Sequence, residues 1–118
     1  MLKPVQLGKS GLQVSQLCLG TLNFGVPGQG NQGDWTLPAD EAREILRAAV
    51  DHGLFYFDCA NAYGTGACEE VVGQLLREML PRDEYVLTTK IAAPMGGHPN
   101  MGGLSRKHII EGMDRSLR

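Results

Sequence analysis

This sequence of 118 residues lacks long apolar runs and lacks an excess of positive charge. A membrane-spanning helix takes about 20 consecutive apolar residues, and the runs here are much shorter. Eleven basic against thirteen acidic residues leave a net charge of −2, so we expect no surface for nucleic acid or for an anionic membrane. The start of the chain has no apolar signal-peptide core, which predicts a cytoplasmic protein.

Cysteine and histidine are both scarce, with three residues of each. The cysteines are Cys18, Cys59 and Cys68, an odd number without metal-ligand spacing, so we expect reduced thiols and no metal site. The histidines are scattered along the chain as well. The remaining composition, with 42% apolar and 20% charged residues, is ordinary for one soluble globular domain.

Short apolar runs alternate with segments whose apolar residues recur every three or four positions. The runs predict buried strands, and the recurring spacing predicts amphipathic helices. Gly53 and Pro81 mark the ends of two helices, and Ser105 is placed to cap the start of a third. The expected strands are 16–21, 54–58 and 85–91, and the expected helices are 39–52, 68–80 and one that follows Ser105 and buries Ile109, Ile110, Met113 and Leu117.

The order of these elements predicts an α/β fold. Turn residues at 8–11 lie between alternating apolar positions, which predicts a β-hairpin. After the hairpin, the order β-α-β-α-β-α is typical of a parallel sheet with right-handed crossovers. Two architectures fit this order, a doubly wound open sheet and the opening of a (β/α)8 barrel. Three strands cannot close a barrel of about eight, so we expect residues 1–118 to be the N-terminal part of a longer chain.

The stretch Gly28–Gly33, GQGNQG, spells the G-x-G-x-x-G pattern of dinucleotide-binding loops. That motif needs a strand directly before it and a helix directly after it, so that the helix N-terminus meets the pyrophosphate. Here Pro27 precedes the stretch, and the next helix starts only after Pro38. We therefore interpret the stretch as a flexible loop. Trp35, further along this loop, is either one wall of a substrate pocket or an exposed aromatic residue.

Three polar side chains lie where strands of the expected sheet end. Asp58 ends the second strand, Tyr63 follows it in a loop, and Lys90 ends the third strand. The carboxyl ends of parallel strands share one edge, where catalytic groups gather, so the three side chains can meet. An ammonium favours the phenolate form of a neighbouring tyrosine, which suits proton transfer near neutral pH. The alternative is a plain Asp58–Lys90 ion pair, with Tyr63 as a loop aromatic residue.

Four stretches resemble the aldo-keto reductase family: LGTLNFG, DCANAYGTGACEEVVGQLL, TTKI and SRKHIIEGMDRSLR. The likeness covers nearly the whole chain, and its most specific element is D-x-A-x-x-Y-G. The resemblance implies a (β/α)8 barrel, of which this chain would hold the N-terminal three β/α units after a hairpin. It also implies binding of NADPH and reduction of an aldehyde or ketone by hydride transfer. The family's proton donor corresponds to Tyr63, and its supporting aspartate and lysine correspond to Asp58 and Lys90.

The resemblance further implies which residues contact the cofactor. Gly20, Thr21 and Asn23 fall where the family touches the cofactor with backbone and small polar groups, and Asp58 belongs to the same set. The family's fourth catalytic residue, a histidine after the fourth strand, would lie beyond Arg118. We therefore expect the 118 residues alone to be inactive.

Two positions depart from the family pattern, since Cys59 and Cys68 stand where threonine or serine is commoner. Both changes keep a small side chain. The resemblance also admits a second function, a cofactor-binding regulatory or interaction subunit on the same barrel, like the β subunits of potassium channels. The intact set of Asp58, Tyr63 and Lys90 favours the enzyme, whose ligands would be NADPH and a small carbonyl substrate.

Overall fold

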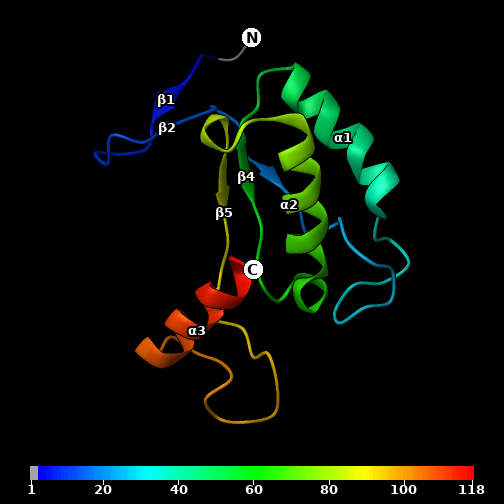
Figure 1. The fold of residues 1–118 in the computed structure, drawn as a ribbon, viewed down its shortest axis with the longest axis vertical. Helices are drawn as coiled ribbons and strands as arrows, with labels where there is room; N and C mark the ends of the chain where they lie inside the picture. The colour runs from blue at the N-terminus through cyan, green and yellow to red at the C-terminus, as the bar shows by residue number, and fades with distance from the viewer. Residues whose placement is uncertain (1–2) are drawn as a thin grey trace.

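The computed structural model describes residues 3–118, which form two small sheets and three α-helices (Figure 1). None of these helices is both long and apolar enough to cross a membrane, within the described range. The strands are β1 (Val5–Gln6), β2 (Gln13–Val14), β3 (Leu19–Gly20), β4 (Tyr56–Asp58) and β5 (Val86–Thr88). The helices are α1 (Ala39–Asp51), α2 (Ala67–Met79) and α3 (Arg106–Ser116), with the short 3-10 turns η1 (Tyr63–Gly66) and η2 (Arg82–Glu84).

The chain begins with the predicted β-hairpin. Strands β1 and β2 pair antiparallel, with Val5 opposite Val14. Gly8 and Gly11 in the connecting turn have φ angles of 59° and 80°, which glycine adopts without steric cost.

The second sheet contains β3, β4 and β5 in that order, all parallel. Its register places Gly20 beside Asp58 and Asp58 beside Thr88, so the carboxyl ends share one edge, at the lower end of the sheet in Figure 1. The parallel β-α order predicted from the sequence is thus confirmed. Each strand is shorter than predicted. Lys90 lies beyond the end of β5 at Thr88. There the regular pairing of β4 with β5 has ended, and the Asn61 N–H donates a single hydrogen bond to the Lys90 carbonyl oxygen at 3.2 Å.

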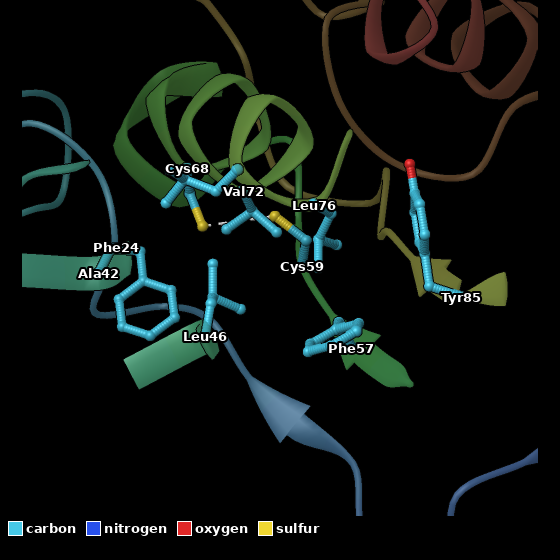
Figure 2. Close-up of a cluster of buried hydrophobic side chains, with 10 residues drawn as sticks. Phe24, Ala42, Leu46, Phe57, Cys59, Cys68, Val72, Leu76 and Tyr85 are labelled. Carbon is cyan, nitrogen blue, oxygen red and sulfur yellow. Dashed lines mark hydrogen bonds between the residues drawn. The ribbon is translucent and has the colours of Figure 1, made fainter. Parts of the chain in front are cut away.

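Helices α1 and α2 cover one face of the parallel sheet (Figure 1). Leu46 of α1 and Val72 of α2 join Phe57 of β4, which is fully buried, in one cluster, whereas Ile45 of α1 is exposed. Burying one large apolar side chain contributes about 1.5–3 kcal/mol, so this cluster stabilises the strands that carry polar residues at their ends. The buried cluster (Figure 2) consists of Phe24, Ala42, Leu46, Phe57, Cys59, Cys68, Val72, Leu75, Leu76 and Tyr85.

Two members of this core are thiols that contact each other. Cys59 Sγ donates to Cys68 Sγ at 3.4 Å, and Cys68 Sγ donates to the carbonyl oxygen of Thr21 at 3.0 Å. Figure 2 shows the two sulfur atoms facing each other between β4 and α2. The hydrogen bond with Cys59 and burial both raise the pKa of the Cys68 thiol, so this residue stays protonated and acts as a small core side chain.

Helix α3 begins as predicted but buries a different side. Ser105 Oγ accepts a hydrogen bond from the backbone N–H of His108 at 3.1 Å, which confirms the predicted N-cap. The buried residues are His108 and Gly112, because Gly112 approaches Ile91 so closely that a Cβ would lie 2.4 Å from Ile91 Cγ2. The predicted apolar side, which consists of Ile109, Ile110, Met113 and Leu117, is exposed within the described residues.

Candidate active site

Asp58, Tyr63 and Lys90 come together at the carboxyl edge of the parallel sheet. Asp58 is the last residue of β4, Tyr63 is the first residue of η1, and Lys90 follows β5. The backbone bond from Asn61 N–H to Lys90 O ties the segment after β4 to the segment after β5. The juxtaposition predicted from the sequence is present in the structure.

The Lys90 ammonium donates to three oxygen atoms. Its Nζ lies 2.6 Å from Asp58 Oδ2, 2.8 Å from the Cys59 carbonyl oxygen and 3.1 Å from the Tyr63 hydroxyl. An ammonium has three N–H donors and no acceptor, so the Tyr63 oxygen must accept in this bond. The hydroxyl proton of Tyr63 therefore points away from Lys90.

Thr88 completes this group, and reasoning from the sequence missed it. Its Oγ1 donates to Asp58 Oδ1 at 2.7 Å, so Thr88 and Lys90 bind different oxygens of one carboxylate. The sequence spacing could have indicated this role. Thr88 and Lys90 are two residues apart, and alternate residues of a strand face the same side. The register of β4 with β5 sets Thr88 beside Asp58.

The Asp58–Lys90 pair is partly open to solvent, with side-chain exposures of 36% and 50%. Burial raises the pKa of the Asp58 carboxyl, but the hydrogen bonds from Lys90 and Thr88 outweigh it and hold that pKa below its ordinary value. Burial lowers the pKa of the Lys90 ammonium, but its bonds to Asp58 and Tyr63 hold that pKa above its ordinary value. Both groups are therefore charged at neutral pH.

We expect the Asp58 carboxyl to titrate below its ordinary pKa of 3.8, and Lys90→Met to raise the midpoint. Burial raises the pKa of Asp58. In the Lys90→Met variant, only the Thr88 hydrogen bond still lowers that pKa. Because the folded-state pKa is depressed, the stabilisation from this pair is present above the ordinary pKa and is lost as the pH falls through the folded-state pKa. Carboxyl ¹³C NMR of labelled aspartate at acidic pH measures the midpoint.

Lys107→Met is the control for this titration, since Lys107 pairs with Glu111 on α3. This variant removes an exposed lysine of the same charge and should leave the Asp58 midpoint unchanged. An Asp58 midpoint that stays in place when Lys90 is replaced would contradict the ion pair.

The residues predicted to contact a cofactor differ in their exposure. Gly20 and Asn23 are exposed, and the space where a Cβ of Gly20 would stand is open. Thr21 is fully buried, and its Oγ1 donates to the carbonyl oxygen of Asp58 at 2.9 Å. Thr21 therefore joins the end of β3 to the end of β4, and its side chain does not face the open edge.

The loop between β3 and α1 carries hydrogen bonds from one of its own side chains. Gln32 is only 3% exposed, and its Nε2 donates to the carbonyl oxygens of Leu22 and Phe24 at 3.0 and 2.8 Å. This buried amide replaces the apolar contacts that a loop of small residues cannot make. Trp35 is 50% exposed, which favours the exposed-aromatic alternative for that residue.

Comparison with known proteins places this geometry in a family. The chain matches the Aldo/keto reductase family over residues 16–118. An Arabidopsis thaliana protein named "Probable voltage-gated potassium channel subunit beta" is 46% identical over 114 residues, which cover 95% of this chain and 32% of that protein. The L-glyceraldehyde 3-phosphate reductase of Escherichia coli is 40% identical over 116 residues, which cover 94% of this chain and 31% of that enzyme.

A solved structure agrees with this assignment. An aldo-keto reductase from Bacillus halodurans in its holo form superposes with a TM-score of 0.76 at 29% identity, over 100% of this chain and 36% of that one. The chain thus spans about a third of the length of these relatives. Such neighbours are (β/α)8 barrels, and this chain has the hairpin and the N-terminal three β/α units of that fold. The chain belongs to the aldo/keto reductase family.

Proposed function

We propose that the full-length protein, of which residues 1–118 form the N-terminal portion of a single domain, reduces aldehydes or ketones to alcohols with NADPH. Family membership supports oxidoreductase chemistry on carbonyl compounds. The observation that carries the proposal is the hydrogen bond in which Lys90 donates to the Tyr63 hydroxyl at 3.1 Å. That bond leaves the hydroxyl proton available for a substrate.

Tyr63 is the proton donor in this proposal. Its O–H, directed away from Lys90, would meet a carbonyl oxygen bound at the open edge of the sheet. As the carbonyl is reduced, its oxygen gains negative charge and takes the Tyr63 proton, and the neighbouring ammonium stabilises the phenolate that remains. Asp58 holds the ammonium in place through a bond of 2.6 Å from Lys90 Nζ. Thr88 in turn holds the Asp58 carboxylate through a bond of 2.7 Å.

The residues at this edge fit a nicotinamide cofactor. Gly20 lies beside Asp58 in the sheet register, and the open space where a Cβ would stand lets a flat ring approach the backbone. Gly20, Asn23 and Asp58 would therefore hold the cofactor, with Thr21 fixing the strand end beneath them. When bound, the cofactor supplies the hydride.

A regulatory or interaction subunit on the same fold is the second candidate function. The observation that favours it is the 46% identity with the Arabidopsis protein named as a potassium channel β subunit. A regulatory subunit would bind the same cofactor, so cofactor binding alone does not separate the two functions. Turnover with a carbonyl substrate does.

The separating experiment follows NADPH oxidation by the full-length protein with and without 4-nitrobenzaldehyde. We expect oxidation that depends on the aldehyde and that is faster with NADPH than with NADH. A protein that binds NADPH but does not oxidise it with any of a panel of aldehydes and ketones would contradict the reductase proposal and support the regulatory one. Equal rates with both nucleotides would contradict the NADPH preference alone.

A further inference from the structure

Two amide side chains of the GQGNQG stretch bind the backbone of Gly64, the residue that follows Tyr63. Asn31 Oδ1 accepts from Gly64 N–H at 2.9 Å, and Gln29 Nε2 donates to the Gly64 carbonyl oxygen at 3.0 Å. The two contacts, here called the amide clamp, join residues 33 and 35 positions apart. They connect the loop after β3 to the turn after β4, which lie beside each other in Figure 1.

The turn that the amide clamp holds has an unusual backbone. Gly64, Thr65 and Gly66 have φ angles of 59°, 54° and 99°. A β-branched residue such as Thr65 is a genuine outlier in the left-handed region, and such conformations persist only where the surrounding structure fixes them. The loop packs directly on this turn, since a Cβ on Gly64 would lie 2.3 Å from Gln32 Oε1.

Glycine at position 30 allows the loop to come this close. Gly30 has a φ angle of 58°, and a Cβ there would lie 2.4 Å from Thr65 Oγ1. Gly30 therefore lets the loop fold against η1, and the amides of Gln29 and Asn31 supply the hydrogen bonds.

The amide clamp acts on the two peptide groups that follow Tyr63. The N–H bound by Asn31 belongs to the peptide between Tyr63 and Gly64, and the carbonyl oxygen bound by Gln29 belongs to the peptide between Gly64 and Thr65. Tyr63 is only partly buried, and its ring packs against the edge of the core cluster, so contacts outside the core also hold it. Its hydroxyl must nevertheless stay 3.1 Å from Lys90 Nζ, and a misplacement of about 1 Å in an active site can cost about 10²-fold in rate.

We propose that Asn31 and Gln29 are positioning residues that hold the Tyr63 hydroxyl against Lys90 for proton transfer. The inference rests on the proposed reductase function, because it assigns these residues to the same reaction. The inference also gives a role to the GQGNQG stretch. Its glycine spacing matches the dinucleotide-binding motif, but it lacks the strand before it and the helix after it that the motif requires.

The test uses the full-length protein with Asn31→Leu and Gln29→Met, which keep the approximate size of each side chain and remove the acceptor and the donor. Both residues are exposed, so both variants should fold. Loss of one hydrogen bond corresponds to about two- to tenfold, and we expect kcat for an aldehyde to fall by that factor with little change in KM for NADPH. Asn31→Asp keeps the acceptor and should stay close to wild type.

Gln74→Met is the matched control. Its exposed amide donates to Glu78 on the same helix and not to η1. We expect kcat to be unchanged. In a Tyr63→Phe background, Asn31→Leu and Gln29→Met should cause no further loss of kcat, because they act through the hydroxyl that is already absent.

Two further measurements judge the amide clamp independently of activity. Hydrogen exchange of the Gly64 amide should be faster in Asn31→Leu than in wild type or in Gln74→Met. The ¹³C resonance of Tyr63 Cζ should shift in both clamp variants, because the ring and Lys90 no longer meet in one geometry.

The outcomes separate this inference from the proposed function. Unchanged Gly64 exchange and an unchanged Tyr63 resonance would overturn the amide clamp, whatever the activity. A shifted resonance together with full activity in Tyr63→Phe would support the amide clamp and contradict the role of Tyr63 as the acid. A further loss of kcat in the Tyr63→Phe background would show that Asn31 and Gln29 do not act through the hydroxyl, which also overturns the inference.

Discussion

Tyr63→Phe lowers kcat for aldehyde reduction by the full-length protein about 10²–10⁴-fold, the usual contribution of general acid catalysis. The substitution removes the hydroxyl that Lys90 contacts at 3.1 Å and keeps the ring, so little contact area is lost. NADPH should therefore bind nearly as tightly as before. Single-turnover oxidation of NADPH at saturating aldehyde measures the chemical step apart from product release, and fluorescence titration measures cofactor binding.

Tyr85→Phe is the matched control for this result. Tyr85 precedes β5, at the opposite end of that strand from Lys90, and its ring lies 4.9 Å from the Arg82 guanidinium carbon. Removing its hydroxyl should leave kcat unchanged. If Tyr63→Phe keeps more than about a third of the wild-type kcat on an unactivated aldehyde, the loss is far below that of a general acid, and Tyr63 is not the proton donor.

The meeting of Asp58, Tyr63 and Lys90 was predictable because it depends on strand direction and order and not on exact register. Once three strands are parallel, their carboxyl ends share an edge, and residues at the ends of adjacent strands are neighbours. The Thr88 hydrogen bond was not predictable in the same way. It depends on the register that sets Thr88 beside Asp58, and short strands with apolar residues on both sides leave that register open.

Helix α3 and the GQGNQG stretch show a second limit. Apolar periodicity identifies a side of a helix but not the element that covers it, and in α3 the close approach to Ile91 selects the small residue Gly112. In the loop, many glycines and polar residues predict flexibility. The amides of this loop, among them the buried Gln32, bond to backbone groups whose positions the sequence pattern does not predict.

Lys90→Met should have the second large effect on catalysis. The substitution keeps an unbranched stem and removes an ammonium that binds three oxygen atoms. Hydrogen bonds to charged groups contribute about 1.5–3 kcal/mol, so loss of the bond to Tyr63 corresponds to about 10- to 150-fold in kcat/KM. Steady-state kinetics with NADPH and a simple aldehyde measure this ratio.

The pH–rate profile of Lys90→Met separates the charge of Lys90 from its role in holding Tyr63. On the high-pH limb, activity falls as the ammonium that stabilises the developing phenolate loses its own proton. Burial lowers the pKa of Lys90, but the bonds to Asp58 and Tyr63 hold that pKa above its ordinary value. Lys90→Met lacks this titration, so the limb should move to higher pH. Lys107→Met, which breaks only the exposed pair with Glu111, should change neither the rate nor the limb. If the Lys90→Met profile falls in height but does not move, Lys90 acts by position alone, and the electrostatic role assigned to it is wrong.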